Sequence, residues 1–313
     1  MSDDIRPSQR ARGGLRDMRA LVASRQAARV STATTAARED LSDRQGFAQD
    51  FLDDFTVALP TPVGERAEDV TPVPGRDDGR LDYTHFSLVM SRSRRLAIFT
   101  ALNLDGRRLV SVPRENDDWR FDPRIDPALQ AGEELYARNP LDRGHLVRRT
   151  SANWGELAEQ ANADTFHFTN CTPQMAAFNQ RTWLGLEDYL LEHARADRQR
   201  LCIFTGPVFR ASDRDYRGVR IPEAYWKVIA FRGEDGRPSA TAYMIDQTDE
   251  LDELGPGFFF GQYRTYQRSI ARIEALTQLD FGELSDFDGF SVEERATGTR
   301  IEAEIRGPED IRV

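Results

Sequence analysis

The chain has 313 residues and a formal net charge of −10; it is 39% hydrophobic and 30% charged. This length suffices for one large domain or two small ones with a sizeable core. The acidic balance argues against a protein that coats nucleic acid with its whole surface, although it leaves room for a local basic cleft.

The first 58 residues predict a helical N-terminal arm. Apolar residues at helical spacing favour a short helix over about 14–30, and a second helix is expected over Ser42–Phe55 with Ser42 as its N-cap. Two interpretations stay open: an arm that docks a regulatory partner or a second copy of the chain, or an appendage packed on the main domain. Residues 59–80, rich in Pro and Gly, predict a linker.

Targeting and redox signals are sparse. The N-terminal region carries no apolar segment typical of a secretory signal, and no run of residues approaches the length of a membrane span. Cys171 and Cys202 are too few for a disulfide framework or a zinc site. We therefore expect a cytoplasmic protein without a membrane partner, with export by a non-classical route left open.

Residues 81–285 predict the folded domain, and residues 286–313 a C-terminal extension of unknown role. Because strands and helices alternate irregularly instead of forming repeated βαβ units, the expected fold class is α+β with a mainly antiparallel central sheet. The expected strands are Phe86–Met90, Leu96–Leu104, Thr165–Thr169, Leu201–Phe204, Trp226–Phe231 and Ala240–Ile245, and the expected helices are 127–138, 175–196 and Ser269–Leu279.

Residues 142–145 read Asp-Arg-Gly-His and carry the clearest chemistry. A histidine is partly neutral near pH 7, so His145 can act as the general base that activates a water molecule. Arg143 could brace a phosphate oxygen or could simply pair with Asp142. These residue types together suit the attack of water on a phosphodiester, in which cations offset the charge that builds on the phosphate.

Three further polar residues follow His145 at informative positions. Asn179 and Glu187 are eight residues apart, which on one helix means about 12 Å of rise and about 80° of rotation. They could hardly both bind one ion directly, but they could share a hydrated Mg²⁺, with Asn179 as the ligand and Glu187 ordering metal-bound water. Asn170 could take part in catalysis or could cap a turn before Thr172-Pro173.

With these residues in place, the chain resembles the DNA/RNA non-specific endonuclease family of ββα-metal (His-Me finger) nucleases. The resemblance covers about residues 80–285 and lies in motifs of the chain that include Asp142–His145, Asn170 with Thr172-Pro173-Gln174, Asn179-Gln180 with Trp183, Leu186-Glu187, Thr205-Gly206-Pro207 and Tyr225-Trp226-Lys227. Some members carry an arginine where this chain has Leu191, and the upstream arginine that stabilises the transition state matches either Arg120 or Arg95.

The resemblance implies a Mg²⁺-dependent enzyme, with Mn²⁺ as a substitute, that cuts DNA and RNA with little sequence preference and leaves 5′-phosphate ends. It implies His145 as the base, Asn179 as the metal ligand, Glu187 as the water-orienting carboxylate, and Arg143 and Asn170 as supporting groups. Two alternatives stay open. One is a catalytically silent module that binds nucleic acid or regulates a partner, and the other is a defence or toxin nuclease that a partner activates.

Overall fold

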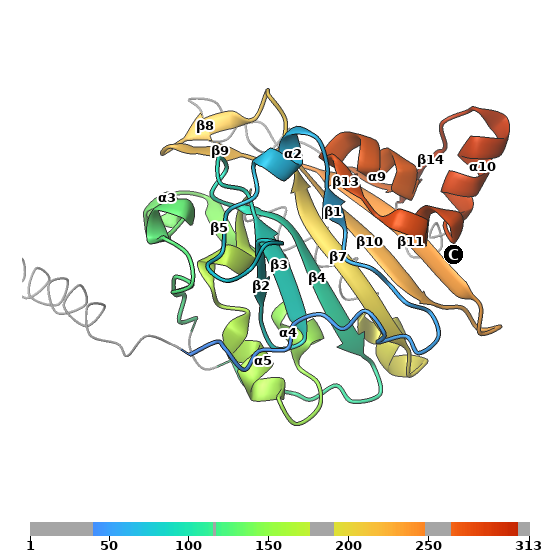
Figure 1. Cartoon of the computed structure of the whole chain (residues 1–313), viewed down its shortest axis with the longest axis horizontal. Helices are drawn as coiled ribbons and strands as arrows, with labels where there is room; N and C mark the ends of the chain where they lie inside the picture. Colours follow the sequence, from blue (N-terminus) through green and yellow to red (C-terminus); the bar gives the residue numbers. More distant parts are fainter. Residues whose placement is uncertain (1–39, 115–116, 176–190, 248–263, 306–313) are drawn as a thin grey trace, which may run out of the picture. The chain divides into compact units, whose positions relative to one another are not determined.

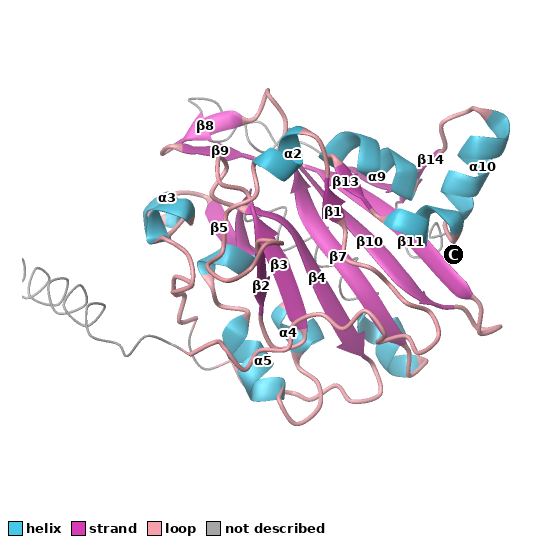
Figure 2. Cartoon of the chain, in the orientation of Figure 1, coloured by secondary structure: helices cyan, strands magenta, loops and turns pink. Residues whose placement is uncertain are grey.

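The computed structural model describes residues 40–114, 117–175, 191–247 and 264–305. Within these ranges, an eight-stranded sheet forms the centre of the unit that begins at Leu41 (Figures 1 and 2). All of its neighbouring strands pair antiparallel. In spatial order the strands are β14 (Glu302–Ile305), β12 (Arg264–Arg268), β11 (Pro238–Asp246), β10 (Ala224–Arg232), β7 (Arg200–Val208), β4 (Ala97–Asp105), β3 (Phe86–Met90) and β2 (Arg80–Asp82).

The central strands read as nearly continuous apolar runs because both faces of the sheet are buried. In β10, Tyr225 and Ile229 pack into one hydrophobic cluster, whereas Trp226 and Val228 pack into the other. Successive side chains of a strand point to opposite faces, so this alternation assigns each cluster to one face. The sheet is therefore a middle layer, covered on both sides by the remaining elements.

Shorter elements supply the covering layers (Figure 2). Three pairs of strands lie outside the central sheet: β1 (Thr61–Pro62) with β13 (Leu279–Asp280), β5 (Leu141–His145) with β6 (Cys171–Met175), and β8 (Arg214–Tyr216) with β9 (Val219–Ile221). The helices that lie wholly within the described residues are α2 (Glu65–Glu68), α3 (Glu133–Tyr136), α4 (Arg149–Ala152), α5 (Ala158–Asp164), α9 (Ile270–Thr277) and α10 (Gly289–Thr297), with 3-10 turns η1 (Pro127–Leu129), η2 (Phe168–Asn170) and η5 (Gly282–Asp286). Residues 191–196 are also helical.

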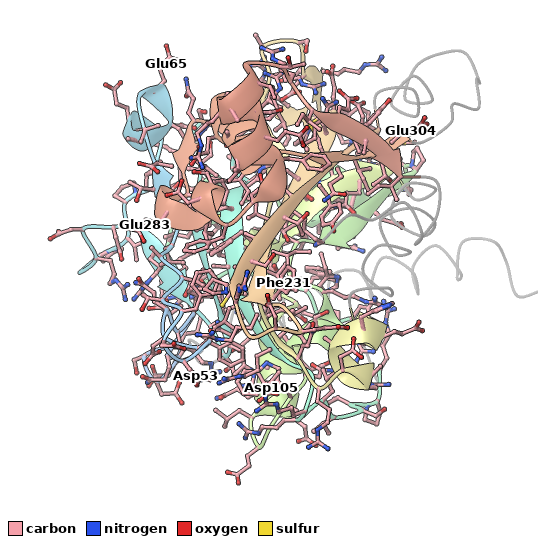
Figure 3. The ribbon with its side chains drawn as sticks, turned by 90° about the vertical axis from the view of Figure 1, so that its right-hand side faces the viewer. Asp53, Glu65, Asp105, Phe231, Glu283 and Glu304 are labelled. Atoms are coloured by element: carbon pink, nitrogen blue, oxygen red, sulfur yellow. The ribbon has the colours of Figure 1, made fainter. Side chains whose placement is uncertain are left out.

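The two faces are covered by different parts of the chain. Residues of α3, α4, α5, β5 and β6 join the cluster that contains Tyr225 and Ile229. On the other face, Ile270 and Ile273 of α9 pack with Trp226 and Val228. Figure 3, turned by 90° from Figure 1, brings α9 and α10 to the front, and Phe231 near the end of β10 lies below them. The two faces of the central sheet are thus covered by different segments of the chain.

The segment before the sheet differs from the expectation. Residues 41–58 belong to the compact unit, and Ser42–Phe55 forms turns instead of a helix. Phe47 and Phe55 are buried as the apolar pattern predicts, but the backbone N–H of Phe47 donates to Ser87 Oγ at 2.8 Å and that of Ala48 to Asn103 Oδ1 at 2.7 Å. These bonds to the sheet replace the intrahelical bonds, because tertiary partners satisfy the same donors.

The linker and the extension that the sequence predicts are also folded. Residues 59–80 contain β1, α2 and the start of β2, and the predicted extension contains α10 and β14, which pairs with β12 at the edge of the sheet. Asp288 caps α10 by accepting from the N–H groups of Phe290 and Ser291, and Gly298 ends it in a left-handed conformation. The helix expected over 14–30 lies outside the described residues.

Two other expected elements differ in detail. Residues 165–169 do not form a strand: α5 ends at Asp164, His167 makes one isolated bridge to Arg120, and η2 follows. The helix expected over 127–138 is split into η1 and α3 around Gly132. The other expected strands and the helix α9 lie where the sequence predicts them. Within the described residues, no helix has both the length and the apolar character needed to cross a membrane.

Candidate active site

The Asp-Arg-Gly-His motif forms most of β5, which pairs with β6 beside the central sheet. In this ladder His145 lies opposite Cys171, and Gly144 lies opposite Thr172. The chain then leaves the strand at Leu146, whose N–H donates to the carbonyl of Asn170 at 2.9 Å. His145 therefore ends a strand and lies where a loop begins, as is common for residues that act on a substrate.

Gly144 is required by a close approach from the neighbouring strand. A Cβ atom at this position would lie 2.1 Å from the amide carbon and the Oε1 atom of Gln174. The Gln174 side chain thus occupies the space that any other residue at 144 would need. Its Oε1 is buried and has no hydrogen-bond partner among the described residues. Gln174 therefore brings an unsatisfied polar atom next to the strand that carries His145.

Asn170 fixes the backbone that follows His145. Its Oδ1 accepts from the N–H of Val147 at 2.9 Å, and its Nδ2 donates to the carbonyls of Val147 at 3.1 Å and Thr165 at 3.0 Å. The side chain is fully buried. Both ends of the amide are thus used in structural bonds. This geometry favours a positioning role for Asn170 over contact with a substrate.

Aromatic rings frame His145. The ring of Trp119 lies 4.8 Å from the imidazole, and that of Phe166 lies 5.2 Å away in an edge-on arrangement, centroid to centroid. His145 is partly exposed, but its Nε2 atom is buried and has no hydrogen-bond partner among the described residues. Burial lowers the pKa of His145 from its ordinary value of 6.5 to about 3, against an opposing effect of Asp117. The imidazole is consequently neutral at pH 7.

The Trp119 segment is held by a buried network. The Tyr83 hydroxyl donates to Asp122, which also pairs with Arg124 at 2.7 Å. Burial works to raise the pKa of Asp122, but the hydrogen bonds and charge of Arg124 outweigh it, so the pKa lies below its usual value. Next to Trp119, Arg120 exchanges two backbone bonds with Phe166 and Phe168. The sequence reading missed Trp119, since nothing in its local pattern sets it apart from a core tryptophan.

Several arginines surround His145. Arg114 and Arg149 both lower the pKa of His145 through their charge, after the larger effect of burial. Arg149 is fixed by the carbonyl of Val112 at 3.0 Å and by Asn162 Oδ1 at 2.8 Å. Arg143 forms an ion pair with Glu133 of α3, not with Asp142 as one interpretation had it. Arginines thus gather locally in an acidic chain, whereas Asp117, which pairs with Arg114, has the larger charge effect on His145.

Two arginines, Arg120 and Arg95, are candidates for stabilising the transition state. Of these, Arg120 directly follows Trp119, whose ring packs against His145. Arg120 Nη2 donates to the carbonyl of Ala163 at 3.1 Å and its Nε to His167 Nε2 at 3.3 Å. Arg95 instead pairs with Glu134 and donates to the carbonyl of Gln130. Arg120 is thus linked to the His145 surroundings through its backbone bonds to Phe166 and Phe168.

Two of the predicted site residues, Asn179 and Glu187, lie outside the described residues, as does Trp183. Among the described residues, no group of three or more His, Cys, Asp or Glu side chains is arranged to hold a metal ion. His85 and His167 have structural roles: His85 stacks on Trp154 at 3.5 Å, and His167 Nδ1 bonds the carbonyl of Asp164 at 2.9 Å.

A cavity of about 320 Å³ has Phe166 among its lining residues. We call it the histidine-side cavity. Since Phe166 both lines this cavity and packs edge-on against His145, the two sites share a wall. The cavity is lined by Val112, Pro113, Asp118, Arg120, Glu159, Asn162, Ala163 and Phe166.

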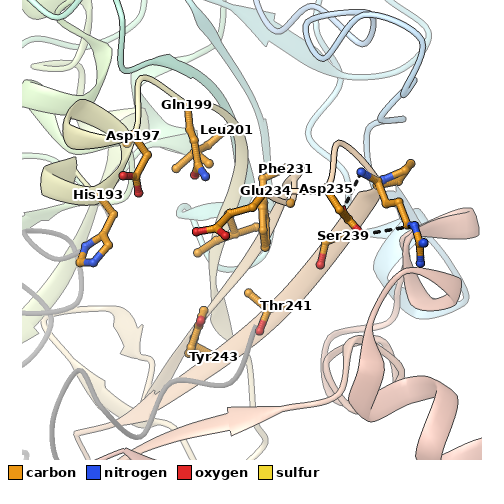
Figure 4. A pocket seen from close by; sticks show the side chains of 15 residues that line it. His193, Asp197, Gln199, Leu201, Phe231, Glu234, Asp235, Ser239, Thr241 and Tyr243 are labelled. Carbon is orange, nitrogen blue, oxygen red and sulfur yellow. Dashed lines mark hydrogen bonds and ion pairs between the residues drawn. The ribbon is translucent and has the colours of Figure 1, made fainter.

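A larger cavity, of about 540 Å³, lies over the ends of β7, β10 and β11 (Figure 4). We call it the acidic cavity. Its floor includes Leu201, Ile229, Phe231, Thr241 and Tyr243, and its rim includes His193, Asp197, Glu234, Asp235 and Arg237. Figure 4 shows Glu234 pointing toward the side on which Asp197 and His193 lie, whereas Asp235 pairs with Arg237. Its carboxylates make it a poor match for phosphate.

Comparison with known sequences identifies the family of this chain. The sequence model of the DNA/RNA non-specific endonuclease family matches residues 63–286. The chain belongs to this family. The match begins in the segment that the sequence reading took for a linker, in keeping with the folded elements found there.

Relatives in this endonuclease family include proteins from bacteria and mitochondria. The uncharacterized protein y4fB of Sinorhizobium fredii is 38% identical over 85% of this chain and 43% of its own length. Human mitochondrial endonuclease G is 28% identical over 46% of this chain and 50% of its own length, and the Serratia marcescens nuclease is 30% identical over 42% and 51%. The chain thus spans about half the length of these relatives, or less.

A solved structure supports the fold of this family member. The crystal structure of the EndoG/EndoGI complex, which addresses the mechanism of EndoG inhibition, contains a chain that matches with a TM-score of 0.52 and 18% identity. The match covers 67% of this chain and 88% of that one. Together with the antiparallel sheet, it confirms the expected ββα-metal fold class.

Proposed function

We propose that this protein is a metal-dependent endonuclease that hydrolyses phosphodiester bonds of DNA and RNA with little sequence preference. The observation that carries the proposal is the state of His145. Its Nε2 is buried without a partner among the described residues, burial keeps the ring neutral, and arginines surround it. A neutral imidazole has one unprotonated ring nitrogen, which a general base needs in order to accept a proton from water.

The residues near His145 fit a hydrated hard metal ion. Gln174 Oε1 and His145 Nε2 are buried acceptors with no described partner, and both suit hydrogen bonds from ordered water. Asn179 is proposed as the direct ligand of Mg²⁺ or Mn²⁺, with Glu187 ordering metal-bound water. When bound, the metal would offset negative charge on the phosphate oxygens.

Each remaining residue has a distinct part in the proposed reaction. His145 Nε2 takes the proton of the attacking water, while Trp119 and Phe166 limit access of bulk solvent to the ring. Asn170 holds the backbone after His145 in place through Val147. Arg143, which Glu133 restrains here, and Arg149 supply positive charge for the phosphate.

Cleavage of plasmid DNA and of single-stranded RNA by the purified full-length chain tests the proposal. We expect products in the presence of Mg²⁺ or Mn²⁺, and none after chelation with EDTA. A catalytically silent binding module would instead retard nucleic acid in a gel without producing fragments. Retardation without metal-dependent fragments would refute the endonuclease assignment.

A second candidate role concerns control by the N-terminal region. The sequence of residues 1–58 predicts a helical arm. We propose that this region engages a regulatory partner or a second copy of the chain, as in a partner-activated nuclease. A chain starting at Leu41 should then differ from the full-length chain in oligomeric state or in nuclease rate. Equal values for both properties would contradict a regulatory arm.

A further inference from the structure

The histidine-side cavity is built for something other than a phosphate. It places the carboxylates of Asp118 and Glu159 beside the guanidinium of Arg120 and the amide of Asn162. A phosphate would be repelled by the two carboxylates, whereas a flat, uncharged ring with both donors and acceptors on its edge would use all four groups. Phe166 and Pro113 add apolar wall against which such a ring can stack.

The polar groups of this cavity are already oriented. Asn162 Oδ1 accepts from Arg149 Nη1 at 2.8 Å, which turns the amide so that its Nδ2 is the end left for a ligand. Arg120 is fixed by the carbonyl of Ala163 and by His167. No hydrogen bond or ion pair engages the Glu159 side chain within the described part of the chain, and this side chain is exposed at the cavity. A ligand would thus meet two oriented donors, the Asn162 amide and the Arg120 guanidinium, and the carboxylate of Glu159 as an acceptor.

Two residues, Phe166 and Arg149, connect the histidine-side cavity to His145. Phe166 is shared: its ring packs 5.2 Å from the imidazole and also lines the cavity. Arg149 makes a second link, since it bonds Val112 and Asn162 of the cavity wall and also acts on His145 through its charge. A phosphate held at His145 would therefore have this cavity as its neighbour, across the shared wall of Phe166.

We propose that the histidine-side cavity receives one unstacked nucleobase next to the bond that is cut, and that it favours bases with an exocyclic amino group over thymine and uracil. This inference rests on the proposed nuclease function. Guanine, adenine and cytosine each offer amino hydrogens to Asp118 or Glu159 and ring or carbonyl acceptors to Asn162 and Arg120. Thymine and uracil offer one N–H flanked by two carbonyl oxygens, which the carboxylates repel.

A consequence concerns the form of the substrate. A base can enter the cavity only after it leaves its stack and its partner strand, and this step is easiest in strands that are already single. Single-stranded DNA and RNA are therefore the preferred substrates. The preference among bases is a bias of about tenfold, as expected for one or two hydrogen bonds to a base edge. Such a bias is compatible with an enzyme that cuts at many sites.

The test uses oligothymidylate strands that carry a single central dG, dA, dC or dT, with the full-length chain and Mg²⁺. We expect cuts to concentrate beside dG, dA and dC by about tenfold relative to the dT control. The Glu159→Gln variant should reduce this bias to about twofold or less, and Asn162→Asp should also reduce it while keeping the acceptor that Arg149 uses. Glu156→Gln removes the same charge three residues away, outside the cavity, and should leave the bias intact.

A binding measurement separates failure of this inference from failure of the proposed function. Calorimetric titration of the full-length chain with dGMP and with dTMP needs no cleavage, and we expect dGMP to bind about tenfold more tightly. Cleavage that is uniform along the strands, with equal binding of both nucleotides, would overturn the cavity assignment and leave the nuclease intact. Tighter binding of dGMP that Glu159→Gln abolishes, without any cleavage, would support the cavity and refute the nuclease function.

Discussion

The acidic cavity and the histidine-side cavity differ in chemistry more than in size. The acidic cavity is the larger, at about 540 Å³ against about 320 Å³, and it combines an apolar floor with a rim that carries Asp197 and Glu234. The histidine-side cavity mixes carboxylates with Arg120 and shares the Phe166 wall with His145. Cavity volume alone would therefore favour the acidic cavity, whose carboxylates do not suit a nucleic-acid substrate.

The comparison teaches that charge and neighbours identify a nucleic-acid site in an acidic protein. The carboxylates of the acidic cavity repel a polyanion, and neither Trp119 nor Phe166, the two rings that frame His145, lines it. Around His145, by contrast, the charges of Arg114 and Arg149 act on the imidazole, opposed by that of Asp117. Three pairs of matched variants and one double variant can break or sharpen this contrast.

The largest expected effect is at the base itself. His145→Ala should lower the rate of Mg²⁺-dependent cleavage of plasmid and RNA by about 10²–10⁴-fold, the usual contribution of a general base. His193→Ala, at the rim of the acidic cavity, removes the same side chain and should leave the rate unchanged. Initial rates on both substrates measure the effect. Comparable losses in the two variants would end the distinction between the regions.

The next effect concerns the network that holds the Trp119 segment. Asp122→Asn removes a buried partner of Arg124 and should lower the free energy of unfolding by about 3 kcal/mol at pH 7. Asp235→Asn breaks an exposed pair with Arg237 and should cost at most about 1 kcal/mol. Urea unfolding monitored by circular dichroism compares the two variants.

The Asp122 contribution also has a defined pH dependence. The pKa of its carboxyl is lowered in the folded state, so its stabilisation is fully present above the ordinary value of 3.8 and is lost as the pH falls toward the depressed value. The difference in unfolding free energy between wild type and Asp122→Asn should therefore shrink below about pH 4. A difference that grows with acid would contradict the assigned direction.

A smaller effect is expected from filling the space above Gly144. Gly144→Ala forces the Gln174 side chain to move, which should cost about 1–3 kcal/mol of stability and displace His145. Gly289→Ala is the matched control, because an added Cβ there meets nothing within 4 Å. Thermal unfolding and cleavage rates would be measured for both. Full activity of Gly144→Ala would show that Gln174 has no part in positioning the motif.

The smallest effect belongs to the acidic cavity. Asp197→Asn combined with Glu234→Gln removes two exposed charges that repel a polyanion, and should raise the cleavage rate by about twofold at most, only at low salt. Cleavage assayed at two ionic strengths would detect this. A strong loss of activity in the double variant would instead mean that the acidic cavity takes part in the reaction.

Much of this protein could be predicted from the sequence where the signal is local. The apolar runs of β3, β4, β7, β10 and β11 specify strands that are buried on both faces, and Ser269 caps α9 where the pattern predicts. His145 is set apart by its neighbours in the chain. The family is carried by such short motifs, and the match over 63–286 confirms it.

Local patterns failed where distant partners supply the hydrogen bonds. Ser42–Phe55 has a helical apolar pattern, but its backbone donates to Ser87 and Asn103 of the sheet, and Asp53 adopts a left-handed conformation. Asn170 was read as a turn former or a catalytic group, whereas its amide binds Val147 and Thr165. No spacing rule reveals such bonds, because they join segments that only the fold brings together.

By itself, the sequence determined the fold class, the strands of the central sheet and the identity of the histidine that could act as a base. Only the tertiary structure decided that Trp119 and Phe166 frame this histidine, that Gln174 fills the space over Gly144, and that burial keeps the imidazole neutral. The physical reason is that chemistry resides in residue types, which are local, whereas burial, charge fields and packing depend on residues far apart in the chain.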